Sequence, residues 1–518
     1  MDDTCGDRWQ ARLVERLRAR LAAETAGGAE VIETHISRVL LAGEVAYKLK
    51  RPVRLGFLDF STLARRRHFA EEELRLNRRL AAPLYLGVLP ITGSLAEPRL
   101  GGDDPVLDYA VHMRRFPQQA LLTRRTLTPD ITDALAERIA AFHEGLPAAA
   151  PDAPWGAPEQ VLAPMLENFR VIREAVPRDA ELHARLDRLE GWTRRTFADL
   201  MPVLTTRRQA GCIRECHGDL HRGNIAVLDG RPVIFDCIEF NPAFRWIDTM
   251  SELAFLLMDL EHGGEVAQAR RLLNGYLMRT GDYAGLAVLR FYMVYRALVR
   301  AKVTTIGAAQ HHHGDASLEA ALRGYVRRAL ALSRAPAPRL VILCGLSGSG
   351  KTSLAAALSE RLPLLHIRSD VERKRLFGLP PLARTRAAPG AGIYAPDVGE
   401  RTYRHLLALA RGIIEAGYGV LVDATFLAAG QRCAFRELAR ELGCPFDILV
   451  LEAPRAVLCE RVARRLAAGE DASEADLGVL RHQLASRAPL SAVERERAVF
   501  IDTRGAPALD ALARILPL

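Results

Sequence analysis

The sequence predicts an α+β unit of two lobes followed by an α/β unit built on a parallel sheet. Before residue 115 extended segments prevail, whereas helical periodicity dominates between about 130 and 333. After residue 339 short apolar segments alternate strictly with helices, which is typical of a parallel sheet covered on both faces. At 518 residues the chain exceeds a single hydrophobic core, so several domains are expected.

Four extended segments and one amphipathic helix define the first lobe. The extended segments are 30–35, 39–41, 45–50 and 107–114, and the helix is 65–80. Helices fill the second lobe, apart from a loop-and-hairpin region at 214–240. A small sheet-rich lobe that leads into a larger helical lobe is the outline of a kinase. We therefore expect a kinase-like N-lobe at 1–115 and a kinase-like helical C-lobe at 116–333.

A linker separates this part from the α/β unit. The segment 334–338 reads Arg-Ala-Pro-Ala-Pro, and its two prolines favour a semi-extended connection. The third domain is expected at 339–518. Its predicted strands are 340–344, 364–368, 419–423, 446–451 and 498–502, with helices between them.

Charge and hydropathy limit the classes of partner. The net charge of +9 suits phosphate-bearing partners, nucleotides first and nucleic acid second, although many arginines, such as Arg12, Arg16 and Arg20, fit solvated helix faces. No charge-free apolar run approaches the ~20 residues that span a bilayer, and no signal-peptide pattern opens the chain. The sequence therefore predicts a cytoplasmic protein with no membrane partner.

Cysteine and histidine usage favours neither disulfides nor a zinc centre. The eight cysteines are scattered without a framework. Cys212 and Cys216 lie near His217 and His221, but their spacing fits no standard zinc pattern. The run His311-His312-His313 is interpreted as a solvated loop rather than a metal site.

A phosphate-binding loop opens the α/β unit. The apolar run 340–344 leads into Gly-Leu-Ser-Gly-Ser-Gly-Lys-Thr at 345–352, a full match to the P-loop pattern. The glycines let backbone N–H groups surround phosphates, the lysine adds charge, the threonine hydroxyl suits Mg²⁺, and the next helix adds its positive end. The expected nucleotide-binding residues are Gly345, Gly348, Ser349, Gly350, Lys351 and Thr352.

Two aspartates and a basic helix point from phosphate binding toward a small kinase. Asp370 is expected to close the second strand of the sheet, and Asp423 to close the third, so both would face the ligand crevice. Asp370 could instead cap a helix, and Asp423 could be an ordinary strand-end carboxylate. Arg461 and Arg465 lie one turn apart on a helix and could stabilise charge on a transferred phosphoryl group.

This constellation resembles the P-loop kinases that include gluconate kinases, zeta-type toxins and the phage polynucleotide 5′-kinase. The resemblance implies that Asp370 takes the proton of the acceptor hydroxyl and that Arg373 holds the acceptor. It also implies that Arg461 and Arg465 are lid arginines, and that Asp423 and Thr352 hold Mg²⁺.

The segment Cys216-His-Gly-Asp219-Leu-His-Arg-Gly-Asn224 carries a second set of chemical groups. Asparagine follows aspartate by five residues, the interval that protein kinases use in the catalytic loop. Glycine before Asp219 makes the segment resemble aminoglycoside and choline phosphotransferases instead. The resemblance implies that Asp219 is the base and that Asn224 and Asp236 bind metal. Glu239 is left open as a second metal ligand or an ion-pair partner.

An upstream lysine completes this second set. Val45-Ala-Tyr-Lys48 resembles the kinase strand whose lysine grips the ATP phosphates, with Lys50 on the same face as the alternative. Among the glutamates at 71–73 we favour Glu73 as its partner. Asp248 resembles the helix aspartate that braces the catalytic loop. No glycine-rich loop joins the first strands, which again fits aminoglycoside kinases.

The whole chain resembles bacterial proteins described as bifunctional aminoglycoside phosphotransferase/ATP-binding proteins. The resemblance implies ATP and Mg²⁺ at two sites, each passing the γ-phosphoryl group to a hydroxyl of a small molecule that the sequence does not name. One alternative is a P-loop ATPase switch coupled to a degenerate kinase-like binding domain. Another is a polynucleotide 5′-hydroxyl kinase in the last domain. Nucleic acid is not favoured, because no aromatic residues interleave with Arg or Lys.

Overall fold

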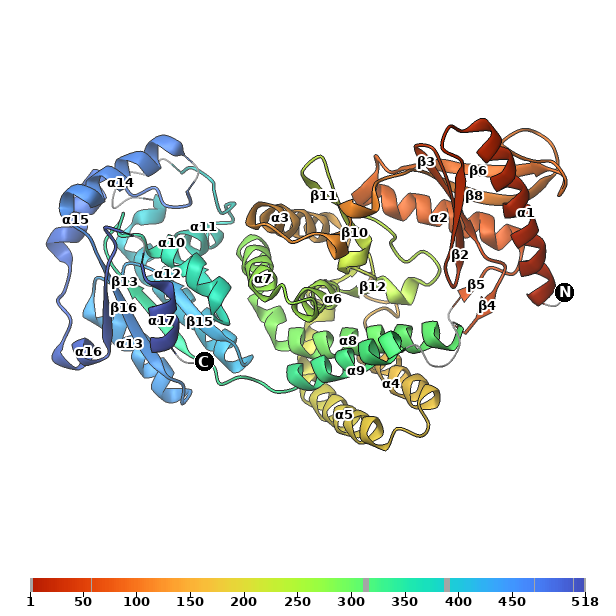
Figure 1. Cartoon of the computed structure of the whole chain (residues 1–518). Helices are drawn as coiled ribbons and strands as arrows, with labels where there is room; N and C mark the ends of the chain where they lie inside the picture. Colours follow the sequence, from red (N-terminus) through yellow and green to blue (C-terminus); the bar gives the residue numbers. More distant parts are fainter. Residues whose placement is uncertain are drawn as a thin grey trace. The chain divides into compact units, whose positions relative to one another are not determined.

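The computed structural model describes residues 3–56, 58–310, 316–385, 392–469, 471–505 and 507–516; the histidine run 311–313 lies outside these ranges. The chain forms two compact units (Figure 1). The first comprises residues 1–134, 141–263 and 291–330, and the second 135–140, 264–290 and 331–518. The domain boundaries expected at 115/116 and 334–338 stay a prediction. No helix among the described residues is long and apolar enough to cross a membrane.

A six-stranded antiparallel sheet opens the first unit, with strand order β1-β2-β3-β8-β6-β7. The strands are β1 (Ala29–Glu33), β2 (Ser37–Ala42), β3 (Val45–Lys50), β6 (Tyr85–Gly93), β7 (Pro98–Leu100) and β8 (Val106–Arg114). All four predicted extended segments are confirmed, whereas β6 and β7 were not predicted. A two-residue ladder pairs β4 (Arg54–Leu55) with β5 (Leu58–Asp59).

Two helices cover opposite faces of this sheet, because side chains alternate along each strand. Helix α1 (Asp3–Glu24) packs on the face that carries Leu40 and Tyr47. Helix α2 (Leu63–Ala81) packs on the other face, which carries Leu41 and Ala46. Lys48 and Lys50 share the parity of Ala46, so the strand directs both lysines toward α2.

Helices and two short hairpins form the rest of the first unit. The helices are α3 (Pro129–Gly145), α4 (Pro158–Ala175), α5 (Ala180–Gln209), α6 (Thr249–His262), α8 (Leu286–Gln310) and α9 (Ala316–Leu332). Strand β9 (Ile213–Glu215) pairs with β12 (Trp246–Asp248), and β10 (Ile225–Leu228) pairs with β11 (Arg231–Ile234). The two ladders hold the segment 216–224 between them, and α6 is buried over 249–260.

A five-stranded parallel sheet forms the centre of the second unit, in the order β14-β15-β13-β16-β17. The strands are β13 (Leu340–Cys344), β14 (Leu364–Arg368), β15 (Gly419–Asp423), β16 (Phe446–Glu452) and β17 (Ala498–Asp502). All five predicted strands are confirmed. Strand β13 is central and fully buried, as its unbroken apolar run predicts.

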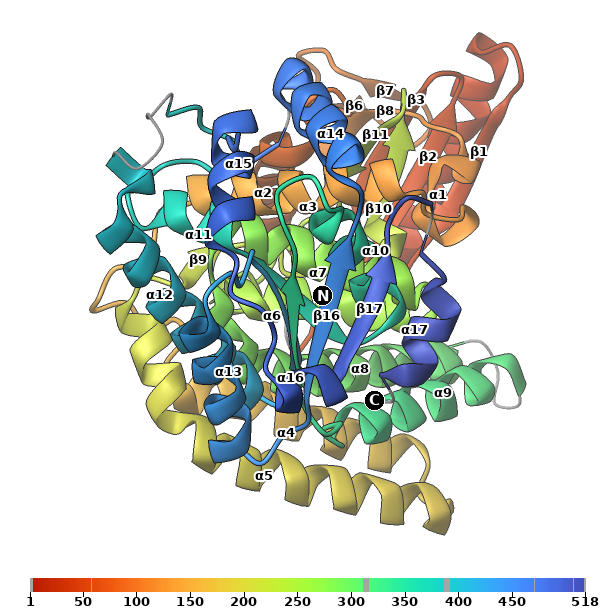
Figure 2. The same ribbon diagram turned by 90° about the vertical axis from the view of Figure 1, so that its left-hand side faces the viewer.

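Helices surround this sheet and lie beyond the carboxyl ends of its strands. They are α7 (Val266–Thr280), α10 (Lys351–Arg361), α11 (Ser369–Arg375), α12 (Pro396–Glu415), α13 (Ala429–Glu441), α14 (Arg455–Ala468), α15 (Leu477–Ser486), α16 (Ala492–Glu496) and α17 (Leu509–Ile515). Figure 2 shows α14 and α15 beyond the ends toward which the strand arrows point. Helix α7 contacts edge strand β14, where the Asn274 side chain accepts a hydrogen bond from His366 N at 2.7 Å.

Candidate active sites

Lys48 lies at the centre of a buried charge cluster in the first unit. Its Nζ is 2.9 Å from Glu73 Oε1, and it also forms an ion pair with Asp236. Burial disfavours the charged lysine, yet attraction to Asp236 and Glu73 raises the pKa of Lys48 well above its ordinary value. The structure therefore brings together the lysine, the favoured glutamate and a predicted metal ligand.

Lys50, the alternative lysine, belongs to the same cluster but meets different partners. It forms ion pairs with Glu73 and with Glu239, and all three side chains are buried. Glu73 thus has one carboxylate oxygen on each lysine. Glu239 is an ion-pair partner of Lys50 in this structure, which is one of the two roles that the sequence left open. Burial raises the pKa of Glu239.

The catalytic-loop candidates Asp219 and Asn224 contact each other. Asn224 Nδ2 donates to the carbonyl oxygen of Asp219 at 3.0 Å and to its Oδ2 at 2.9 Å. His221 Nε2 is 3.3 Å from the same Oδ2. Burial alone would raise the pKa of Asp219, but the attraction and hydrogen bond of His221 lower it well below the ordinary value. Asp219 is therefore a carboxylate at neutral pH and can accept a proton.

Glu252 holds the backbone of this loop, a role that the sequence analysis missed. Its two carboxylate oxygens accept hydrogen bonds from the backbone N–H groups of His217 and Gly218, each at 2.7 Å. Gly218 has φ +88°, and a Cβ there would lie 2.7 Å from Phe244 O. The glycine that departs from the protein-kinase sequence is thus required by close backbone approach.

Asp248 does not brace the catalytic loop, so that expectation is wrong. Its carboxylate forms a two-point ion pair with Arg207 at 2.7 and 2.8 Å and accepts a hydrogen bond from Met250 N at 2.8 Å. Asp248 is the N-cap of α6, which directs its oxygens to the first turn of the helix. Glu252 lies one turn further on and reaches the loop instead. The available signal was a buried acid one turn into an otherwise apolar helix, although Asp259 is likewise a buried acid of that helix.

Asp236 adopts a backbone conformation that is rare for its residue type. Its φ is +64°, in the left-handed region that aspartate tolerates better than most side chains. Its backbone N–H donates to Tyr85 Oη at 3.2 Å. The family's usual glycine after this aspartate is replaced by Cys237, whose backbone N–H donates to Asn77 Oδ1 at 2.9 Å.

The donor set around Asp236 suits a hard divalent cation. Asp236 offers carboxylate oxygens, and Asn224 uses its amide nitrogen on Asp219, which leaves its amide oxygen as a ligand. Mg²⁺ prefers such oxygen donors, one or two of them from protein, with the remainder from phosphates and water. These residues fit the metal that the resemblance implies.

The P-loop of the second unit has the backbone that its glycines predict. Gly348 and Gly350 have φ of +82° and +88°, and a Cβ at Gly345 would lie 2.9 Å from Leu451 O. Lys351 Nζ donates to Leu346 O at 2.9 Å, across the loop. Ser349 Oγ is buried and forms no hydrogen bond with any described residue.

Thr352 and Asp423 form the second oxygen-donor pair. Thr352 Oγ1 donates to Asp423 Oδ2 at 2.6 Å, and His366 Nε2 is 3.4 Å from the same oxygen. Burial would raise the pKa of Asp423, but His366, Lys351 and Arg368 lower it below the ordinary value. A hydroxyl and a buried carboxylate beside a P-loop are oxygen donors that suit Mg²⁺.

Asp370 and Arg373 face each other on one helix. Strand β14 ends at Arg368, and Asp370 lies in the first turn of α11, so it neither closes the strand nor caps the helix. The strand itself is as predicted, but the expectation that Asp370 closes it is wrong by two residues, because helix α11 begins directly at Ser369. Arg373 Nη1 is 2.9 Å from Asp370 Oδ1, and its guanidinium lies 5.2 Å from the ring centroid of Tyr394.

The two predicted lid arginines have different contacts. Arg461 donates to Thr503 O at 2.6 Å and to Gly348 O in the P-loop at 3.5 Å. Arg465 donates to Ala475 O at 2.9 Å, on the loop that follows α14. The structure therefore places Arg461 beside the phosphate-binding loop. Arg465 instead donates to the loop that follows α14.

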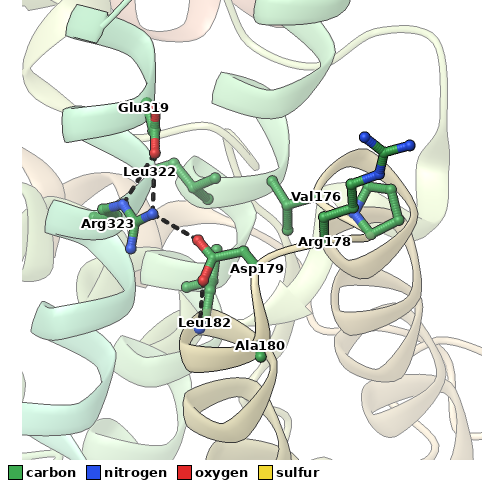
Figure 3. Close-up of a pocket in the computed structure, with 9 residues that line it drawn as sticks. Val176, Arg178, Asp179, Ala180, Leu182, Glu319, Leu322 and Arg323 are labelled. Carbon is green, nitrogen blue, oxygen red and sulfur yellow. Dashed lines mark hydrogen bonds and ion pairs between the residues drawn. The ribbon is translucent and has the colours of Figure 1, made fainter.

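A surface pocket of the first unit lies apart from these residues. Its lining comes from the junction of α4 and α5 and from α9 (Figure 3). Arg323 pairs with Asp179 at 2.6 Å and with Glu319 at 3.0 Å, and Asp179 caps α5 at Leu182 N. Arg323, Asp179 and Glu319 pair with one another in the wall, and none of the predicted catalytic residues lines the pocket.

Comparison with known families also separates the chain into two segments. Residues 54–292 match the model described as "Phosphotransferase enzyme family", and residues 340–490 match the one described as "AAA domain". A choline/ethanolamine kinase family protein from Mesorhizobium loti shares 17% identity, covering 62% of this chain and 96% of its own, with a TM-score of 0.39. The Mycobacterium tuberculosis APS kinase shares 20% identity, covering 35% and 96%, with a TM-score of 0.26.

Sequence relatives extend over both units. An uncharacterized protein of Mycobacterium tuberculosis is 30% identical over 448 residues, which cover 86% of this chain and 88% of the relative. An adenylyl-sulfate kinase of Myxococcus xanthus is 34% identical over 124 residues, 24% of this chain and 63% of that enzyme. The chain belongs to the family of its full-length mycobacterial relative, in which a kinase-like phosphotransferase domain is fused to a C-terminal P-loop kinase domain.

Proposed function

We propose that the protein is an ATP-dependent phosphotransferase with two modules, each moving the γ-phosphoryl group of ATP to a hydroxyl of a small molecule. One observation supports this proposal: each unit contains its own candidate base beside its own candidate phosphate- and metal-binding residues. Those carboxylates are Asp219 in the first unit and Asp370 in the second. Phosphoryl transfer depends mainly on positioning and charge stabilisation, which such sets supply.

In the first module, Lys48 would bind the α- and β-phosphates while Glu73 holds its ammonium in place. Asp236 and Asn224 would hold Mg²⁺, which supplies charge neutralisation on the phosphate oxygens when it is bound. Asp219 accepts the proton of the acceptor hydroxyl. The ion pair between Lys48 and Asp236 supports this arrangement. When Mg²⁺-ATP binds, a phosphate can take the place of Asp236 beside Lys48, and the metal can take the place of Lys48 beside Asp236.

In the second module, backbone N–H groups of the P-loop and Lys351 would cradle the phosphates. Thr352 and Asp423 would hold the metal, and Arg461 lies close enough to the loop to stabilise transferred charge. Asp370 would accept the acceptor's proton, and Arg373 would hold the acceptor. The likeness to an adenylyl-sulfate kinase over 124 residues supports a kinase rather than a switch.

The test uses ATP labelled in the γ-phosphoryl group and a broad panel of hydroxyl acceptors. Lys351→Ala should abolish transfer by the second module and leave the first intact, and Asp219→Asn should do the reverse. Each labelled product is thereby assigned to a module by the variant that loses it.

Three outcomes would contradict the proposal. Robust ATP hydrolysis without any labelled product would indicate a switch. Label confined to 5′-hydroxyl oligonucleotides would indicate a polynucleotide kinase in the last domain. Loss of both activities in either folded variant would contradict two independent modules.

A further inference from the structure

A group of basic side chains lies beyond Asp219 in the helical part of the first unit. Its members come from four elements: Arg222 follows the predicted base, His262 ends α6, Arg300 lies on α8, and Arg327, which is exposed, lies on α9. Burial lowers the pKa of His262, Asp259 raises it, and Arg222, Arg300 and Arg327 lower it further. We call these four residues the basic cluster.

The basic cluster is connected to the predicted base through His221. Arg300 Nη1 lies 3.4 Å from His221 Nε2, and that nitrogen lies 3.3 Å from Asp219 Oδ2. Burial acts to raise the pKa of Asp219, whereas His221 and, to a smaller extent, Arg300 lower it. An acceptor whose hydroxyl reaches Asp219 would therefore place its remaining groups near Arg300.

The carboxylates near the basic cluster are already engaged. Asp259 accepts hydrogen bonds from Arg222 N at 2.9 Å and Arg222 Nε at 3.3 Å, and Glu261 pairs with Arg328. Arg300 contacts Tyr325 Oη at 3.5 Å and His221, and forms no ion pair with a described carboxylate. Arg327 forms none either within the part of the chain that the structure describes.

Burial alone would lower the pKa of Arg300, but Tyr325 and the more distant carboxylates Asp259 and Asp219 raise it, so its charge is partly compensated. Arg300 is half-buried and lies beside the ring of Tyr325 at 5.8 Å. Among the described residues its hydrogen-bond contacts are Tyr325 and His221, which leaves N–H donors for a further acceptor. Its fork suits the oxygens of a phosphate or a carboxylate.

We propose that the acceptor of the first module is an alcohol that carries an oxyanion group, bound by Arg300. This inference rests on the proposed function, in which Asp219 is the base. The hydroxyl oxygen forms a bond to the γ-phosphorus, the bond from that phosphorus to the β-bridging oxygen breaks, and ADP leaves with the electron pair. The hydroxyl proton passes to Asp219. A polycationic aminoglycoside would instead bring ammonium groups against the guanidinium of Arg300.

The first experiment measures binding and needs no activity. The full-length protein is saturated with a non-hydrolysable ATP analogue, and inorganic phosphate is titrated in by calorimetry. Arg300→Gln should weaken phosphate binding about 10- to 100-fold, the usual loss for one charge-assisted contact. Arg300→Lys should restore part of it. Arg178→Gln, which removes an exposed arginine in the pocket of Figure 3, is the matched control and should change nothing.

The second experiment measures transfer in Lys351→Ala protein, where the second module is silenced. Matched acceptors are ribose and ribose 5-phosphate, glucose and gluconate, and the cations choline and kanamycin. Label should appear in anionic members, and Arg300→Gln should raise their KM about 10- to 100-fold with little change in kcat.

The outcomes separate the two proposals. The proposal of an anionic acceptor is overturned if Arg300→Gln leaves the affinity for phosphate unchanged. It is also overturned if label appears in neutral or cationic acceptors and Arg300→Gln leaves their KM unchanged. A fall in kcat and in ATP hydrolysis at constant KM also overturns it, because the arginine would then serve the transferred phosphoryl group. Phosphate binding that depends on Arg300, without transfer to any acceptor, supports the anion site and refutes the proposed phosphotransferase activity of the first module.

Discussion

Glu252→Gln should loosen the catalytic loop of the first unit without disturbing the second. The wild-type carboxylate accepts two backbone hydrogen bonds, each at 2.7 Å, and its side chain is 1% exposed. Glutamine keeps one oxygen acceptor and presents an NH₂ group to the other donor. One buried backbone N–H therefore loses its acceptor, a change that costs about 1–3 kcal/mol.

The pKa of Glu252 reflects the wider surroundings of the same carboxylate. Burial acts to raise it, but His143, the His217 imidazole and the His217 backbone N–H lower the pKa of Glu252 from 4.5 to about 2. Because the histidine side chains account for most of this shift, the effect on the loop is taken from the lost backbone hydrogen bond alone. We expect Glu252→Gln to lower the opening free energy of the loop by about 1–3 kcal/mol, which is roughly 5- to 100-fold in hydrogen-exchange protection.

The assay is hydrogen–deuterium exchange of peptides that span 213–225, together with phosphoryl transfer in Lys351→Ala protein. Glu174→Gln, which removes an exposed carboxylate paired with Arg170 at 2.6 Å, is the control. The folded-state pKa of Glu252 lies below its unfolded value, so its contribution is complete above pH 4.5 and is lost as the pH falls toward about 2. The difference between wild type and variant should narrow across that window. Wild-type exchange and wild-type kcat in Glu252→Gln would refute the bracing role.

Three further predictions concern the candidate sites. Asp236→Asn should weaken Mg²⁺-ATP binding to the first module at least ~10-fold by calorimetry, whereas Asp219→Asn should leave binding unchanged and lower transfer at least ~100-fold; equal loss of binding in both would contradict the assigned roles. Gly218→Ala should abolish first-module transfer and spare the second, because its Cβ would lie 2.7 Å from a backbone oxygen; unaltered transfer would show that the loop can move aside. Asp370→Ala should mainly lower kcat and Arg373→Ala mainly raise the acceptor KM in steady-state kinetics; indifference to Arg373→Ala would argue against an acceptor clamp.

The parallel sheet was predictable because each of its strands is a short apolar run with clear ends. The six-stranded sheet was less so. Strand β6 contains Gly87 and Pro90, and its pairing with β8 shifts register between Tyr85 and Gly87. Those residue types favour turns and bulges, which hide a strand from pattern analysis. The strand forms because β8 and β7 supply its hydrogen bonds, a tertiary effect that no local window contains.

The candidate sites divide in the same way. Motif residues such as Asp219 and Asn224 are five positions apart, and the structure places them in contact. Glu252 is 34 residues from Gly218, and only the fold reveals that its carboxylate accepts that backbone N–H. Arg300 lies 79 residues from His221 and matches no motif. Residue spacing thus predicts which side chains of a motif lie together. The residues that orient those side chains, or that would select an acceptor, come from distant segments and are known only from the packing.

The left-handed backbone at Asp236 bears on how such a chain can drift over evolution. Its φ of +64° suits glycine and asparagine as well as aspartate, so these replacements keep the local conformation at little structural cost. Most other side chains would strain the backbone at this position in addition to removing the carboxylate. A descendant that loses first-module activity is therefore expected to pass through glycine or asparagine at this position while staying folded. With Asp236 as the metal ligand that we propose, the residue at this position in relatives should distinguish active first modules from inactive ones.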